Sequence, residues 1–234
     1  MKSQAIKTLG SESFVVILAL LIAIVLFAAG VGKTQQLQKG VSVQMAVTSS
    51  AAPMPAADNA DAWIITVAAD GSTYFGIDPV TPSGLAEKMK TRPRERDQKL
   101  YIKADARAPF ADVRRMFTAA RDMTFNGAVL LTSQIDSPAP GSVIAPKGLE
   151  VQFAPHSNAA TVVVQIDSDL TLEVNDQKIH AADLQDTLKL LLQNRSDTPV
   201  LVKTHGPVAF APVAQAIDKC RAIGAPVMIS TPEL

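Results

Sequence analysis

The chain has 234 residues, and 22 lysines and arginines balance 22 aspartates and glutamates, so its formal net charge is zero. A chain without a cationic excess is a poor nucleic-acid binder, because phosphate contacts need a surplus of lysine and arginine. Hydrophobic residues make up 47% of the sequence, which excludes general disorder. The single cysteine, Cys220, excludes an intramolecular disulfide and a cysteine-based zinc site.

The first element is a continuous apolar run from Phe14 to Val31, which has no charged or hydrogen-bonding side chain. A helix of this length spans about 27 Å, close to the hydrocarbon thickness of a bilayer. We therefore predict a transmembrane helix over residues 14–32. Two lysines lie on each side of the run, so charge alone does not set its orientation. A cleaved signal peptide is the competing interpretation, although its apolar region is normally shorter.

The sequence beyond this run contains two copies of one module at a constant offset of one hundred residues. Residues 100–121 and 200–221 align without a gap, and apolar positions stay apolar. The matched pairs include Ile102 and Val202, Lys103 and Lys203, Phe110 and Phe210, Val113 and Val213, Phe117 and Ile217, Ala120 and Cys220, and Arg121 and Arg221. We predict two domains, at 41–136 and 149–234, joined by a linker at 137–148 that holds three prolines.

Each copy has the same predicted order of elements. Strand-like runs come first, at 41–47, 63–69 and 72–75 in the first copy, with Asp70-Gly71 as a hairpin turn. Two amphipathic helices and two strands follow. In the second copy, the first of these helices has leucines at i, i+4, i+7 and i+8, namely Leu184, Leu188, Leu191 and Leu192.

The predicted fold class is α+β. One transmembrane helix precedes two tandem two-layer ββαβαβ domains, each with an extra leading strand and two helices on one face of a mixed sheet. The Pro/Ala-rich residues 48–61 interrupt the start of the first copy, and we expect them to form a mobile loop.

This plan resembles the ExbD/TolR family, whose members are subunits of proton-driven machines of the bacterial inner membrane. Residues 102–105, IKAD, are similar to the family's I-x-A-D-like strand end. Residues 40–43, GVSV, are similar to the strand that follows the family's membrane segment, and they recur as GLEV at 148–151. The helix over 213–224 and the strand over 227–232 approximate the family's last two elements. The resemblance covers nearly the whole chain.

The resemblance implies a single-pass inner-membrane protein, with residues 1–13 in the cytoplasm and the bulk of the chain in the periplasm. Two departures stand out. The family normally has one module where this chain has two, and family members carry an aspartate in the membrane helix that transfers protons. Residues 14–31 contain no acid, so we expect no proton-carrying residue in the span. The nearest acid, Glu12, is either a proton carrier or a first-turn acid that complements the helix dipole, with Ser11 as the N-cap.

The function that the resemblance implies is that of a subunit in an ExbB/ExbD-like or TolQ/TolR-like complex. Such a complex couples the proton motive force to protein or biopolymer transport, or to energisation of the envelope. The expected partners are a multi-span ExbB/TolQ/MotA-like channel, a second copy of the chain or an Asp-bearing ExbD paralogue, and a TonB-like protein or peptidoglycan. A membrane-anchored periplasmic binding or scaffold module without a motor role is the alternative.

Exposed sheet edges would give such partners a place for strand addition. The residues expected to make these contacts lie in two segments and are Val41, Val43, Met45, Val47, Leu149, Val151 and Phe153. The three histidines have no metal-ligand spacing, and no nucleophile motif occurs, so we expect no enzyme activity, no cofactor and no metal site. Asp105 has two interpretations, a functional acid at a strand end or a turn residue.

Overall fold

The computed structural model describes residues 40–93, 98–134, 145–154, 162–193, 195 and 197–230. All of these belong to one compact unit, formed by Leu37–Ser137 together with Ala145–Leu234. The predicted membrane helix over 14–32 and the acid Glu12 lie outside the described residues. Within the described ranges, no helix combines the length and apolar composition needed to cross a membrane.

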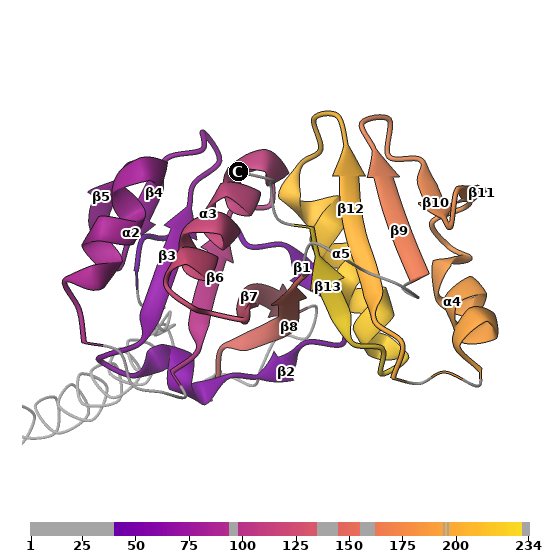
Figure 1. Ribbon diagram of the computed structural model, residues 1–234, viewed down its shortest axis with the longest axis horizontal. Coiled ribbons are helices and arrows are strands. Elements are labelled where there is room, and N and C mark those ends of the chain that lie inside the picture. Colours follow the sequence, from indigo (N-terminus) through magenta and orange to yellow (C-terminus); the bar gives the residue numbers. More distant parts are fainter. Residues whose placement is uncertain are drawn as a thin grey trace, which may run out of the picture. The chain divides into compact units, whose positions relative to one another are not determined.

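In the first copy, three short segments precede the repeated elements (Figure 1). They are β1 (Val47–Thr48), β2 (Ala52–Pro53) and the 3-10 helix η1 (Pro55–Asp58). The repeated elements are β3 (Trp63–Val67), β4 (Thr73–Phe75), β5 (Asp78–Val80), α2 (Pro82–Lys90), β6 (Leu100–Ala104), α3 (Phe110–Asp122) and β7 (Gly127–Gln134). The hairpin predicted at Asp70-Gly71 is confirmed, because β3 and β4 are antiparallel and Gly71 takes a positive φ of 84°.

The second copy repeats this order after one leading strand. Its elements are β8 (Lys147–Phe153), β9 (Val162–Asp167), β10 (Leu172–Val174), β11 (Gln177–Ile179), α4 (Leu184–Leu192), β12 (Val200–His205), α5 (Phe210–Ala222) and β13 (Val227–Ile229). The predicted α+β class with a mixed sheet is confirmed. Each copy also has a short strand, β5 or β11, that the predicted order lacks.

The strands of both copies lie in one continuous sheet. Its order is β11-β10-β9-β12-β13-β8-β7-β6-β3-β4-β5, so each copy contributes one half. Within each half the three central strands are parallel, and β8 joins the halves because it pairs in parallel with β13 and antiparallel with β7. Lys147 and Gly148, which we assigned to the linker, are thus part of the strand that connects the copies.

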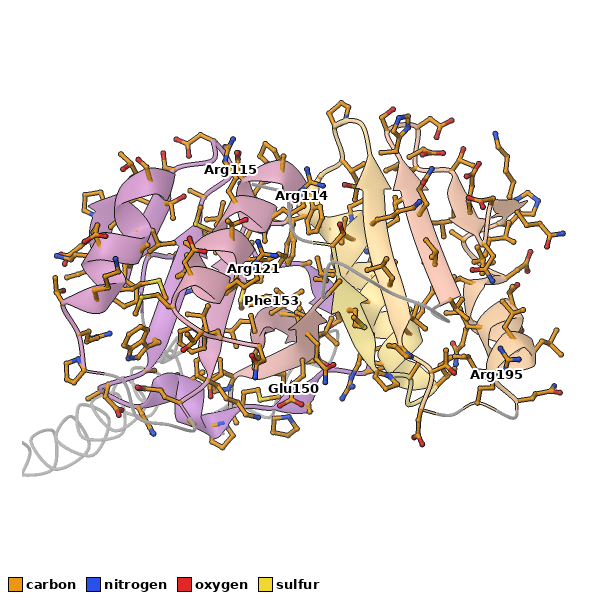
Figure 2. The ribbon with its side chains drawn as sticks, viewed as in Figure 1. Arg114, Arg115, Arg121, Glu150, Phe153 and Arg195 are labelled. Atoms are coloured by element: carbon orange, nitrogen blue, oxygen red, sulfur yellow. The ribbon has the colours of Figure 1, made fainter. Side chains whose placement is uncertain are left out.

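One hydrophobic core lies between the helices and one face of this sheet. The predicted helix faces are buried, with Phe110, Val113, Phe117 and Ala120 in α3 and Phe210, Val213, Ile217 and Cys220 in α5. Leu184, Leu188 and Leu192 of α4 are buried as well. Leu191 is 44% exposed, so its assignment to the buried face is wrong. The core is shared between the copies, because Phe117 of α3 packs on Phe153 of β8 with ring centroids 5.4 Å apart. Phe153 is labelled in Figure 2.

The opposite face of the sheet is covered in the first copy by the chain that precedes β3. Met54 and Ala57 pack there against Ile64 of β3, Tyr101 of β6 and Leu131 of β7, and all five are buried. The prediction of a mobile loop over 48–61 is therefore wrong, since this segment holds β2, η1 and buried side chains. In the second copy, the matching face carries half-buried side chains such as Val163 and Leu201.

Candidate functional site

The two copies meet where helices α3 and α5 begin. The N–H of Phe110 donates to the carbonyl of Val208, and the N–H of Phe210 donates to the carbonyl of Ala108, both at 2.8 Å. Pro109 and Ala209 form an antiparallel bridge between these bonds. The repeat makes the two hydrogen bonds equivalent to each other, and the bridge joins two equivalent residues. This reciprocity is the signature of an isologous interface around a pseudo-two-fold axis.

These reciprocal bonds explain how the two helices are capped. The first N–H groups of a helix have no partner within the helix and need an external acceptor. The N-cap residues, Pro109 for α3 and Ala209 for α5, supply no side-chain acceptor. The carbonyl groups of the other copy take that place, so each copy caps a helix of the other.

A buried carboxylate makes a second connection between the copies. Asp218 of α5 is 7% exposed and accepts the N–H of Ser49 at 2.9 Å, the hydroxyl of Ser49 at 2.9 Å and the N–H of Ser50 at 2.7 Å. Ser49 and Ser50 form the bend between β1 and β2. The equivalent of Asp218 in the first copy is Thr118, whose buried hydroxyl has no hydrogen-bond partner. The connection is therefore asymmetric among the described residues.

Two glycines allow β7 and β8 to approach each other at the junction. A Cβ atom on Gly127 would overlap the carbonyl oxygen of Val151, and a Cβ atom on Gly148 would overlap the side chain of Val129. Any larger residue at Gly127 would have to displace backbone, because the obstacle is a carbonyl group rather than a flexible side chain.

Asp105 ties the start of the first copy to the end of β6. Its carboxylate accepts the N–H of Gln44 at 3.1 Å, the N–H of Arg107 at 3.0 Å and two guanidinium N–H groups of Arg107 at 2.9 and 3.1 Å. These bonds hold the pKa of Asp105 at about 2, below its usual 3.8, chiefly through the Arg107 side chain. Of the two interpretations of Asp105, this geometry fits the turn residue. The second copy has His205 here.

The first segment expected to bind partners lies across the carboxyl end of β6. Val41, Val43 and Met45 are half-buried and alternate with exposed residues, while Val47 is 46% exposed. The strand predicted over 41–47 is reduced to Val47, with Thr48, because the preceding residues make only one bridge, between Met45 and Asp105. Partner binding at this segment stays a prediction.

The second segment lies inside the sheet. Leu149, Val151 and Phe153 are 1%, 3% and 8% exposed, and their strand β8 is paired on both sides. The expectation that this segment is an exposed edge is therefore wrong for the described structure: strand addition would require β8 to leave β7 or β13. The edges of the described sheet are β5 and β11.

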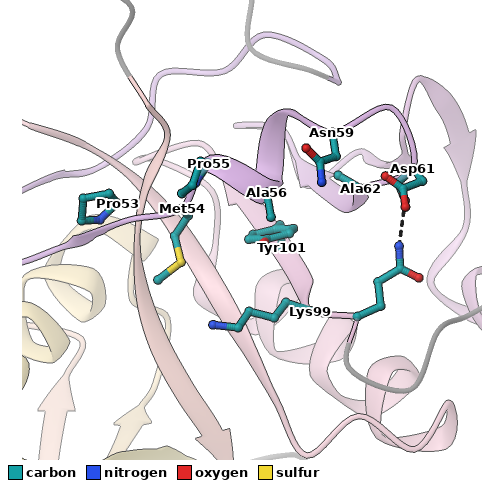
Figure 3. A pocket seen from close by; sticks show the side chains of 10 residues that line it. Pro53, Met54, Pro55, Ala56, Asn59, Asp61, Ala62, Lys99 and Tyr101 are labelled. Carbon is teal, nitrogen blue, oxygen red and sulfur yellow. Dashed lines mark hydrogen bonds between the residues drawn. The ribbon is translucent and has the colours of Figure 1, made fainter.

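A shallow groove of about 390 Å³ opens on the face of the first copy that η1 covers (Figure 3). Tyr101 lies on its floor, Met54 and Pro55 form one side, and Lys99 lies at the rim. Burial raises the pKa of Tyr101, and Lys99 forms an ion pair with Glu150 of β8. The sequence did not predict this groove, because part of its wall comes from residues 48–61, which were expected to form a mobile loop.

The described residues outside the groove were also searched for a reactive thiol and for a metal site. Burial raises the pKa of the Cys220 thiol to about 12, so this group is unreactive as a nucleophile. Among the described residues, no three His, Cys, Asp or Glu side chains are grouped so as to hold a metal ion. The expectations of no cofactor and no enzyme activity stay predictions.

A family model described as the biopolymer transport protein ExbD/TolR matches the chain twice, over residues 4–135 and over residues 128–232. The first match includes the predicted membrane segment and the first copy, and the second match begins within β7 and extends through the second copy. No curated protein matches the chain. Because the two matches together extend over almost the entire sequence and agree with the tandem arrangement of its elements, the chain belongs to the ExbD/TolR family of biopolymer transport proteins.

Proposed function

We propose that this chain is a single-span inner-membrane subunit of an ExbB/ExbD-like or TolQ/TolR-like complex driven by the proton motive force. The observation that carries the proposal is the first family match, which begins at residue 4 and runs through the predicted helix over 14–32 into the first copy. A helix of this length and apolarity suits a bilayer span. The described domains would then lie in the periplasm and connect the membrane complex to envelope partners.

The chain contributes structure rather than a proton-carrying group to the membrane part of this complex. Residues 14–31 contain no ionisable side chain, and an intramembrane acid is the group that proton transfer would require. A multi-span channel of the ExbB, TolQ or MotA type is the proposed partner in the membrane. An Asp-bearing paralogue in the same complex would supply the missing carboxylate.

Co-purification tests this proposal. The full-length chain carrying a C-terminal tag is extracted in mild detergent from its native host and captured, and a channel-type multi-span protein is expected in the eluate. The matched control replaces residues 14–31 with an unrelated single-span helix, which keeps the chain anchored and should lose the channel. A wild-type chain that never recovers such a channel would overturn the motor role and favour the anchored binding module.

A further inference from the structure

The described sheet ends in two equivalent edge strands, β5 and β11, that differ in their capacity to pair with a further strand. Each is the outer strand of a hairpin and holds three residues. Pro79 is the middle residue of β5 and pairs in register with Tyr74 of β4. Lys178 is the middle residue of β11 and pairs in register with Glu173 of β10. Pro79 and Lys178 therefore occupy the same place in the two copies.

The turn between β10 and β11 determines which backbone groups of β11 point outward. Asn175 and Asp176 have positive φ values of 49° and 66°, as in the type I′ turn of a two-residue hairpin loop. In such a hairpin the pair next to the turn, Val174 and Gln177, exchanges hydrogen bonds, and the following pair does not. The N–H and C=O groups of Lys178 therefore point away from β10, toward any strand that is added to this edge.

The first copy closes the equivalent edge. Pro79 has no N–H group, so the outward donor of β5 is missing. Asp78 of β5 also forms an ion pair with Lys88 of α2, with an N–O distance of 3.0 Å. Proline and charged side chains on an edge strand are features that prevent pairing with another chain.

The second copy has lost these features. Lys178 restores the outward donor, and Gln177 and Thr187 stand at the positions of Asp78 and Lys88, where they form no ion pair. Helix α4 lies at the same end of the sheet as β11 (Figure 1). It exposes two large apolar side chains, Leu190 at 68% and Leu191 at 44%. An open strand edge and exposed apolar side chains thus occur together at this end.

We propose that β11 is the docking edge for an extended segment of an envelope partner in which an acidic residue stands between two apolar residues. The backbone of the acidic residue bonds to the N–H and C=O groups of Lys178, and its carboxylate lies opposite the Lys178 ammonium group. Side chains alternate between the two faces of a strand. The flanking apolar side chains therefore lie on the helix face, beside Ile179, which packs against the hydrophobic core.

Lys178 also argues against a second copy of this chain as the occupant. If two β11 strands paired in register about a two-fold axis, their Lys178 side chains would lie opposite each other, which is unfavourable for like charges. An acidic residue in the same place is attracted instead. The edge therefore favours a foreign acidic segment over self-association. This inference deepens the proposed function and rests on it, because it names the chemistry that an envelope partner would present.

Designed peptides test the proposal without knowledge of the natural partner. The probes are fluorescent peptides with the core Val-Glu-Val, or the controls Val-Gln-Val and Val-Lys-Val, between identical threonine-rich flanks. Their binding to the purified full-length chain in detergent is measured by anisotropy at low ionic strength. The Glu peptide should bind about threefold more tightly than the Gln peptide, and the Lys peptide should bind most weakly.

Variants of one residue separate the charge from the backbone contact. Lys178→Ala keeps the outward N–H group and should make the three affinities equal. Lys178→Pro, which introduces the residue of the first copy, should abolish binding of all three peptides. The matched control Lys203→Ala, on the same face of β12, should change neither result.

Hydrogen exchange shows where the peptide binds. The Lys178 amide points outward, so it should exchange more slowly when the Glu peptide is bound. If Lys178→Pro fails to fold, Lys178→Ala and the exchange measurement decide. Equal affinity for the Glu and Lys peptides, full binding to folded Lys178→Pro, unchanged exchange at Lys178, or self-association of the chain through β11 would overturn the proposal. None of these results depends on a channel partner, so failure here is distinct from failure of the co-purification.

Discussion

At the scale of single residues, the two copies use the same positions for different purposes. Asp105 binds the chain that enters the first copy. Its equivalent, His205, is exposed, and its Nδ1 lies 3.5 Å from Oδ1 of Asp167. Lys103 is buried, and Lys203 is half-buried. The repeat predicted these equivalences correctly. It could not predict the different burial, because burial depends on how the rest of the chain packs around each strand in space.

Asp105 should make stability depend on pH. Its pKa in the folded chain is about 2, below the usual 3.8, so its stabilising effect is present above pH 4 and disappears as the pH falls through 2. Asp105→Asn should lower the free energy of unfolding by roughly 1–2 kcal/mol at pH 7, a range reduced because Arg107 is exposed to solvent. Urea unfolding followed by the fluorescence of Trp63, the single tryptophan, measures this loss.

The matched control for Asp105 is Asp186→Asn on α4, whose carboxylate is 81% exposed and should change stability little. An Asp105→Asn deficit that is as large at pH 2 as at pH 7 would contradict the assignment of the low pKa to Asp105.

Glu12 lies outside the described residues, and its role follows from the sequence alone. If it is a first-turn acid rather than a proton carrier, Glu12→Gln should leave the transport or envelope phenotype largely intact in the native host. Complete loss of that phenotype, with normal expression and membrane insertion, would contradict this prediction.

At the scale of elements, helix spacing and the hairpin turn were predictable because they depend on local patterns. The buried faces of α3 and α5 and the β3–β4 turn follow that pattern. The short strands β5 and β11 escaped prediction because they hold three residues each and carry no apolar run. The position of β8 between β7 and β13 was not predicted, because no local sequence pattern indicates that strands of different copies pair. The sequence offered one indication that the copies contact each other: the N-cap positions Pro109 and Ala209 lack a capping side chain, so the helices need acceptors from elsewhere.

The bond network at Asp218 predicts unequal effects at equivalent positions of α5 and α3. Asp218→Ala leaves the N–H groups of Ser49 and Ser50 without an acceptor and should cost about 2–4 kcal/mol of unfolding free energy. Asp218→Asn keeps one acceptor oxygen and should cost less. Thr118→Val removes a hydroxyl that has no partner and should be neutral or stabilising.

Urea unfolding of the three variants in one buffer compares these effects. Equal losses for Asp218→Ala and Thr118→Val would contradict the assignment of Asp218 as a connection between the copies.

At the scale of the whole molecule, the tandem chain contains within one polypeptide the interface between its two modules. The pairing rests on the β7–β8 strand pair, the reciprocal helix caps and the bonds to Asp218. Composition and repeat structure predicted two modules on one membrane anchor. They did not predict that the modules share one sheet, because the contacts that join them, such as Gly127 against Val151, exist only in three dimensions.

One measurement tests this account most directly. A protease site is placed within residues 137–144 of the full-length chain, the membrane complex is purified in mild detergent, and the chain is cut. Capture through a C-terminal tag should then recover the second copy together with the first copy and the channel partner, since the junction holds the halves together. Recovery of the second copy alone would contradict the account.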